Sequence, residues 1–107
     1  MSDKTKVLTA EILKDLQPDA MIYRGECSDL DTATTTGFYN VMQGANGIPD
    51  GAYPYGVLRV YKTRMFVIQE YVPHQAYGTM LGGYLKRVLY TGKWTKWEYY
   101  APTSIQT

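Results

Sequence analysis

Cys27 and His74 are the two side chains whose chemistry could supply a nucleophile and its general base. The chain has one cysteine and one histidine, so a thiol–imidazole dyad is the simplest catalytic pair that it could form. Cys27 follows Gly25 and Glu26 in a segment without any feature that would activate its thiol. A lone histidine in a turn is more often exposed or structural than catalytic. We therefore predict that the protein is not an enzyme, and we keep a small enzyme using Cys27 and His74 as the weakest alternative.

The other polar motifs do not form a recognisable metal or cofactor site. One cysteine and one histidine cannot supply the four ligands of a usual zinc site. A calcium loop needs more oxygen ligands than Asp29 and Asp31 offer, so we expect Asp29 to cap a turn and Asp31 to be solvated. Gly82-Gly83 lacks the Lys-Ser/Thr sequel of a phosphate-binding loop. The sequence therefore predicts no catalytic residue, no metal and no cofactor.

Both tryptophans lie in one short segment, Gly92-Lys93-Trp94-Thr95-Lys96-Trp97. Neighbours along a strand alternate between its two faces, and Trp94 and Trp97 are an odd number of residues apart. We therefore expect their rings on opposite faces, one closing the core and the other facing solvent, another copy or a sugar. The interleaved lysines could also serve a single-stranded nucleic acid, but a formal net charge of +1 disfavours that partner.

The composition is skewed toward tyrosine, with 11 Tyr against 2 Phe. Tyrosine favours strands, and it joins a large apolar ring to a hydroxyl that needs a partner, so it suits sheet faces and interfaces. Together with 10 Gly and 5 Pro as turn formers, this composition predicts a β-rich protein. The aromatic residues that we expect at an interface or against a host glycan are Tyr53, Tyr55, Trp94, Trp97, Tyr99 and Tyr100.

The length of 107 residues indicates one domain, which we divide into three parts. Residues 1–28 form an N-terminal segment with a short helix that begins near Thr9 and ends before Pro18. Its apolar stripe would dock on the same chain or act as an anchor or oligomer contact, through Leu8, Ile12, Leu13 and Leu16. Residues 29–101 form a β-rich knob, and residues 102–107 form a polar tail.

The clearest strands are predicted at 57–62 and 65–71, joined by a tight turn at Thr63-Arg64. Further short strands are expected at 21–24, 38–41, 84–90 and 97–100. Strands that follow one another with short turns favour an antiparallel meander, so the predicted fold class is mainly β with a short N-terminal helix.

Two polar residues fall inside these predicted strands and need partners if they are buried. We expect Gln69 to bond to backbone or to another copy. For Arg87, the candidate partners are Glu70 and Glu98.

No apolar stretch follows the N-terminal residues as in a signal peptide, and no run approaches the roughly 20 apolar residues of a membrane span. We therefore expect a protein that is made and assembled in cytoplasm, without membrane insertion.

Five pieces of the sequence, in order between Asp29 and Trp97, resemble the pyocin-knob type domain of bacteriophage fibre proteins. The pieces are Asp29-Leu30-Asp31-Thr32-Ala33-Thr34-Thr35-Thr36-Gly37-Phe38-Tyr39-Asn40-Val41, Asn46-Gly47-Ile48-Pro49, Tyr55-Gly56-Val57-Leu58-Arg59-Val60, Val67-Ile68-Gln69, and Arg87 with Thr91-Gly92-Lys93-Trp94-Thr95-Lys96-Trp97. They span about two thirds of the chain.

The resemblance implies a non-enzymatic virion protein, such as a head-fibre or tail-fibre subunit. It implies homo-oligomers, with a trimer favoured and a dimer possible, attached to capsid or tail proteins. Because only about 28 residues precede the motif, we expect a compact decoration of the particle rather than a long fibre. A host-glycan (receptor) binding module is the main alternative.

Overall fold

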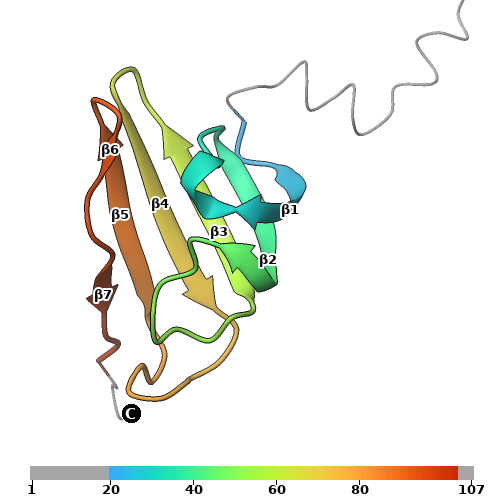
Figure 1. Ribbon diagram of the computed structural model, residues 1–107, viewed down its shortest axis with the longest axis vertical. Helices are drawn as coiled ribbons and strands as arrows, with labels where there is room; N and C mark the ends of the chain where they lie inside the picture. Colours follow the sequence, from blue (N-terminus) through green and yellow to red (C-terminus); the bar gives the residue numbers. More distant parts are fainter. Residues whose placement is uncertain (1–19, 104–107) are drawn as a thin grey trace, which may run out of the picture.

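The computed structural model describes residues 20–103 of the chain (Figure 1). The predicted N-terminal helix, with Leu8, Ile12, Leu13 and Leu16, lies outside the described residues, as does the end of the polar tail.

The described part is built around one seven-stranded sheet, which confirms the mainly β prediction. The strands follow the order β1-β2-β3-β4-β5-β6, and β7 also pairs with β5. The elements are β1 (Tyr23–Asp29), the 3-10 turn η1 (Leu30–Thr32), β2 (Gly37–Asn46), β3 (Gly56–Lys62), β4 (Phe66–Pro73), β5 (Tyr84–Tyr90), β6 (Lys93–Trp94) and β7 (Glu98–Tyr100). From β2 to β5 the strands form an antiparallel meander.

The β3–β4 hairpin has the alternation that its sequence predicts. Leu58 and Val60 on β3 are buried, and Val67, Gln69 and Tyr71 on β4 are buried beside them, while Arg59, Tyr61, Ile68 and Glu70 point to the other face. Branched and aromatic side chains at every second position bury one face of a sheet and stiffen the strand. This pattern fixes the register of the central strands.

The first strand differs from its prediction, because it does not end at Gly25. β1 continues to Asp29 and pairs in parallel with β2, with register shifts on both sides of the Glu26 and Cys27 pairing. Gly25 has a φ of 96°, which glycine adopts at little cost, so the strand bulges there instead of stopping. Most of β1 lies before residue 29, where the knob was predicted to begin, yet the strand is part of the same sheet.

One face of the sheet carries the core. The turn η1 and the 47–55 loop lie in front of the sheet in Figure 1, and the tryptophan segment runs along the β5 edge. All three contribute to the apolar cluster. Gly56 is needed where β3 begins, because a Cβ there would lie 2.5 Å from the carbonyl oxygen of Val72. The buried apolar residues are Cys27, Leu30, Ala33, Val41, Ala52, Leu58, Val60, Val67, Tyr71 and Leu85.

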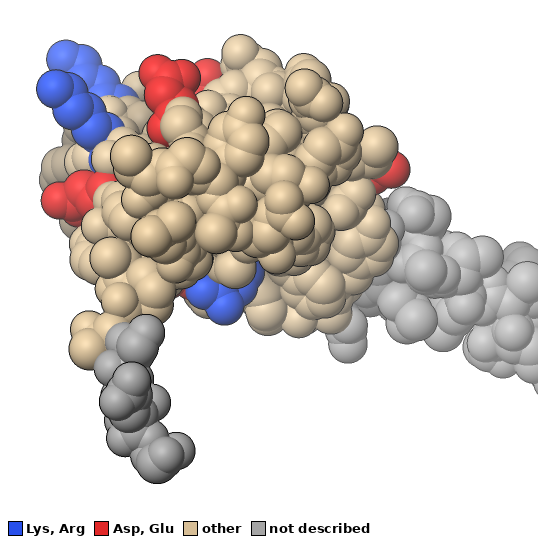
Figure 2. Space-filling model, turned by 90° about the horizontal axis from the view of Figure 1, so that it is seen from below, with Lys and Arg blue, Asp and Glu red and all other residues tan. Residues whose placement is uncertain are grey.

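The two loops at residues 47–55 and 74–83 gather at one end of the sheet, at the bottom of Figure 1. Asp50 is their one acidic or basic residue, counting Asp, Glu, Lys and Arg. In the space-filling view from this end, uncharged residues fill the centre, and charged side chains lie toward the edges (Figure 2). We call it the loop end.

Candidate functional site

The most unusual feature of the core is a buried arginine. Arg87 lies on β5 with only 6% of its surface exposed, and it is paired across the strands with Gln69 of β4, which is fully buried. A buried cation is costly unless its charge and its N–H groups find partners. The residues around Arg87 are therefore the strongest candidates for a functional site in the described part of the chain.

Gln69 connects Arg87 to the turn η1. The Nε of Arg87 donates a hydrogen bond to Oε1 of Gln69 at 2.9 Å. The Nε2 group of Gln69 donates to the carbonyl oxygens of Leu30 and Ala33, at 2.6 and 2.8 Å. The prediction that Gln69 would bond to backbone is confirmed, and these bonds hold the turn on the core face of the sheet.

Both tryptophans contact Arg87. The guanidinium carbon lies 4.1 Å from the ring centre of Trp94 and 4.4 Å from that of Trp97, within the range of cation–π attraction. The Nε1–H of Trp94 also donates to the carbonyl oxygen of Asp31 at 3.2 Å. The two rings thus contact the same cation, and the bond of Trp94 connects the tryptophan segment to η1.

This arrangement corrects the expectation that the tryptophans point to opposite faces. The strand β6 consists only of Lys93 and Trp94, and residues 95–97 are not in a strand. Thr95 turns back to β5: its N–H donates to the Val88 carbonyl, and its hydroxyl accepts from the Val88 N–H. Strand alternation therefore ends before Trp97.

Asp31 supplies the opposite charge. Its Oδ1 lies 2.9 Å from Nη2 of Arg87, an ion pair in which the N–H is not aligned as in a hydrogen bond. Asp31 is exposed, as expected, but the turn also brings its carboxylate to the cation, a pairing that the sequence did not predict. Asp29 caps the turn as predicted, accepting from the N–H of Asp31 at 3.0 Å.

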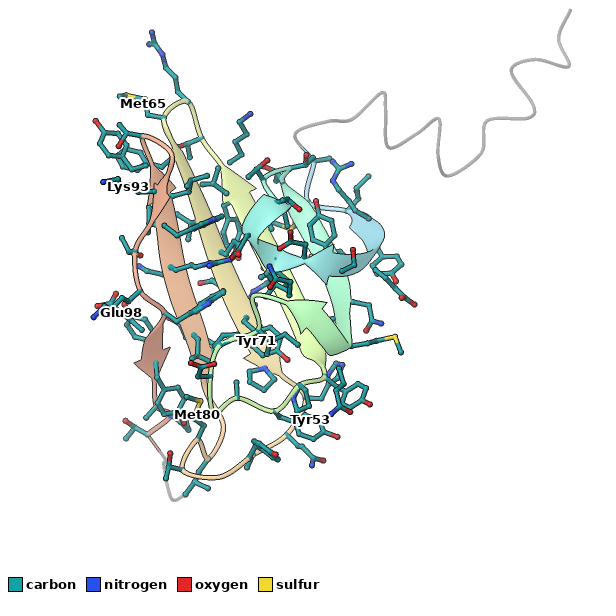
Figure 3. All side chains as sticks on the ribbon, in the orientation of Figure 1. Tyr53, Met65, Tyr71, Met80, Lys93 and Glu98 are labelled. Atoms are coloured by element: carbon teal, nitrogen blue, oxygen red, sulfur yellow. The ribbon has the colours of Figure 1, made fainter. Side chains whose placement is uncertain are left out.

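The predicted partners of Arg87 were also wrong. Glu70 follows Gln69 on β4, so its side chain points to the opposite face, where it pairs with Arg59 at 3.0 Å. Glu98 lies at the exposed edge on β7, in register with Lys86 (Figure 3). We name the set on the core face the arginine cluster: Leu30, Asp31, Ala33, Gln69, Arg87, Trp94 and Trp97.

The electrostatics of the arginine cluster favour a fixed charge over proton transfer. Burial lowers the pKa of the Arg87 guanidinium from its ordinary value, and the Asp31 carboxylate opposes this effect. An arginine remains protonated in proteins, so it is neither an acid nor a base at neutral pH. What the cluster can do chemically is hold the turn, the sheet and the tryptophan segment together.

The hypothetical thiol–imidazole dyad is not assembled. Cys27 lies on β1 and His74 follows β4, three positions away in the order of the sheet. At about 4.8 Å per strand, this separates them by roughly 14 Å, far beyond hydrogen-bond reach. Burial also raises the pKa of the Cys27 thiol, which disfavours the reactive thiolate.

The remaining aromatic candidates divide among three places. Tyr53 and Tyr55 lie at the loop end, with ring centres 5.6 Å apart, and Tyr77 lies 5.8 Å from Tyr53. Tyr99 packs on the core face and donates its hydroxyl to the Gly82 carbonyl at 2.6 Å.

Tyr100 points the other way and is exposed. Its ring stacks on that of Tyr84, with centres 5.1 Å apart. The six aromatic residues predicted to meet a partner therefore do not form one surface.

Sequence reasoning missed two members of these groups. Asp31 was not matched to Arg87, because the carboxylate and the cation lie far apart in the chain. Tyr77 was not included with Tyr53 and Tyr55, because it lies in a different loop. No local signal could have paired these residues, since the loops meet only through the order of the strands.

Comparison with known proteins adds no relative: no family model, no curated protein and no solved structure matches the chain. Within residues 20–103, no helix is long and apolar enough to cross a membrane.

Proposed function

We propose that this chain is a non-enzymatic structural protein of a bacteriophage particle, a short head-fibre or tail-fibre subunit with a β-rich knob. The observation that supports it is the composition of the arginine cluster. Asp31 comes from the first piece of the sequence that resembles the pyocin-knob domain, and Gln69 from the fourth. Arg87 and both tryptophans come from the fifth. Three of the five sequence pieces that resemble the family are therefore in contact with one another in this cluster.

The proposal also accounts for how the polar groups are used. Gln69 bonds through both its amide nitrogen and its oxygen, and the guanidinium of Arg87 lies within 4.4 Å of the centres of two tryptophan rings. A catalytic group needs an accessible reactive atom, whereas these groups stabilise the fold. A rigid knob suits a part that must survive outside the cell. Residues 1–17 would attach it to a capsid or tail protein, and copies of the chain would associate, with a trimer favoured on the resemblance.

The direct test is to purify particles of the phage that encodes the chain and to identify their proteins by mass spectrometry. The proposal predicts this chain in the particle at a fixed ratio to the major capsid protein, with electron microscopy placing it on the outer surface. Its presence in infected cells but absence from purified particles would overturn the proposal.

Host-glycan binding is the second candidate, and one feature favours it. Tyr53, Tyr55 and Tyr77 cluster at the nearly uncharged loop end, where the Tyr55 hydroxyl bonds to Gln43 at 3.2 Å (Figures 2 and 3). The exposed rings of Tyr55 and Tyr77, next to the half-buried Tyr53 and an amide, are suited to stacking on a neutral sugar.

A glycan array tests this candidate. Binding that is lost in Tyr77→Ala, but kept in the matched exposed variant Tyr90→Ala, would support it. No binding by the unmodified protein would reject it.

A further inference from the structure

The face of the sheet opposite the core is open in the described part of the chain. Its side chains on β3, β4 and β5 are half-buried or exposed, and none is buried. The strands alternate, so this face carries the residues between the core positions: Val57, Arg59, Tyr61, Phe66, Ile68, Glu70, Val72, Tyr84, Lys86, Val88 and Tyr90. We call it the open face.

A row of charges with alternating sign crosses the open face. Arg59 is in register with Glu70, Glu70 with Lys86, and Lys86 with Glu98, so the order across β3, β4, β5 and β7 is plus, minus, plus, minus. The Nε of Arg59 lies 3.0 Å from the carboxylate of Glu70. Tyr61 donates its hydroxyl to the same carboxylate at 2.8 Å. The Arg59–Glu70 half of the row is thus ordered within one copy, while the Lys86 ammonium lies 5.8 Å from the centre of the Tyr100 ring.

Apolar rows lie on both sides of the charges. On one side, Ile68 is in register with Tyr61 and Val88. On the other side, Val72 is in register with Val57, and the neighbouring Tyr84 stacks on Tyr100 at 5.1 Å. A face with apolar rows around a single charged row resembles the inside of an interface more than a fully solvated sheet surface.

The alternating row is complementary to itself under one symmetry operation. The operation is a 180° rotation about an axis that runs parallel to the strands, in front of the open face and level with the gap between β4 and β5. It gives a second copy whose strand order is reversed, while each row keeps its position along the strand direction. Arg59 then faces Glu98 of a second copy, and Glu70 faces Lys86 of that copy. An axis perpendicular to the strands, along the row, would instead place each charge opposite itself.

We propose that the open face binds the open face of a second copy about this two-fold axis. The same operation places Ile68 against Val88 and Val72 against Tyr84, so the apolar rows meet apolar rows. Sheets stacked face to face lie about 10 Å apart with strands nearly aligned, as this pairing requires. The inference deepens the homo-oligomer part of the proposed function, and it replaces the favoured trimer with a dimer.

The test measures the mass of the purified full chain by analytical ultracentrifugation across micromolar concentrations. We expect a dimer for the unmodified protein. Glu98→Lys would place a lysine opposite Arg59 of the other copy and should weaken the dimer at least about tenfold. Arg59→Glu, the change at the other end of the row, should weaken it likewise. The matched control for Glu98→Lys is Asp50→Lys at the exposed loop end. It makes the same change from a negative to a positive charge and should leave the dimer intact.

The double variant Arg59→Glu, Glu98→Lys restores opposite charges between the copies and should regain most of the affinity. A monomer would overturn the inference, whether the face is free or is covered by residues 1–19 of the same chain. A trimer, or equal effects of Glu98→Lys and Asp50→Lys, would also overturn it. These measurements do not depend on whether the chain is found in particles, so this inference and the proposed function can fail separately.

Discussion

Gln69 accepts a hydrogen bond from Arg87 across β4 and β5, with Nε and Oε1 2.9 Å apart. This bond joins two halves of the arginine cluster: the amide of Gln69 holds the turn η1, and the guanidinium of Arg87 holds the two tryptophans. Because both side chains are buried, neither half can be removed without leaving a polar group of the other half without its partner.

Replacing Gln69 with Glu should strongly destabilise the fold. The carboxylate would lose both donated bonds and face the carbonyl oxygens of Leu30 and Ala33, which now lie at 2.6 and 2.8 Å. We expect the free energy of unfolding to fall by about 3 kcal/mol. Urea denaturation measures it, with the exposed Gln43→Glu as control. Equal stability of the two variants would show that the amide donors do not matter.

The two tryptophans should differ in what they contribute. Trp97→Phe weakens one cation–π contact and should cost about 1 kcal/mol. Trp94→Phe weakens the other contact and also removes the donor to the Asp31 carbonyl, so it should cost about 1 kcal/mol more. Thermal and urea unfolding followed by circular dichroism would compare them. A larger loss for Trp97→Phe would contradict this assignment.

Two glycines with the same backbone angle offer a matched test of close packing. Gly83 and Gly92 both have a φ of 80°, so alanine is strained at either position. A Cβ at Gly83 would collide with the carbonyl oxygen of Tyr100, whereas at Gly92 it would meet open space. Gly92→Ala should cost about 1 kcal/mol and Gly83→Ala at least about 2 kcal/mol more. Equal losses would mean that β7 can shift away freely.

The core tyrosine predicts a fall in stability at alkaline pH. Burial, and secondarily Tyr53, raises the pKa of Tyr71 from 10.0 to about 12, and its hydroxyl donates to the Tyr53 carbonyl at 2.6 Å. A group whose pKa is raised in the folded state holds its proton more tightly there. Its contribution is complete below pH 10 and is lost as the pH rises to about 12, by up to about 1.4 kcal/mol per pH unit.

Tyr71→Phe isolates this contribution. The variant loses the hydrogen bond and should be less stable than the unmodified protein at pH 8. Between pH 10 and 12, deprotonation of Tyr71 in the unfolded state should lower the unfolding free energy of the unmodified protein. Phenylalanine has no hydroxyl to lose a proton, so the difference in unfolding free energy between the two proteins should narrow. A difference that stays constant over this range would reject a raised pKa for Tyr71.

The sequence predicted the central sheet well. Strands β3, β4 and β5 were expected within one or two residues of their observed bounds, because buried positions such as Leu58, Val60 and Val67 recur at every second residue. Between the strands predicted at 84–90 and 97–100, the chain turns at Thr91-Gly92, where both residues have a positive φ, at 51° and 80°. Local alternation and turn chemistry suffice for such elements.

The candidate site could be predicted only in part. Gln69 and Arg87 stood out because polar residues inside strands need partners, but only the bond of Gln69 to backbone was foreseen. The pairing of Arg87 with Asp31 depends on how η1 crosses the sheet, which no local pattern contains. Likewise, the position of Trp97 depends on Thr95 turning back to β5 after a strand of two residues.

The central claim is that the polar residues of the core act together as one structural unit, and a double-mutant cycle between Gln69 and Arg87 tests it most directly. Urea unfolding of Gln69→Leu, Arg87→Leu and the double variant gives the coupling free energy. Each single change leaves the other polar side chain buried without its partner, whereas the double change removes both. We predict that the two single losses together exceed the loss in the double variant by at least about 1 kcal/mol. Losses that add to within about 0.5 kcal/mol would contradict the claim.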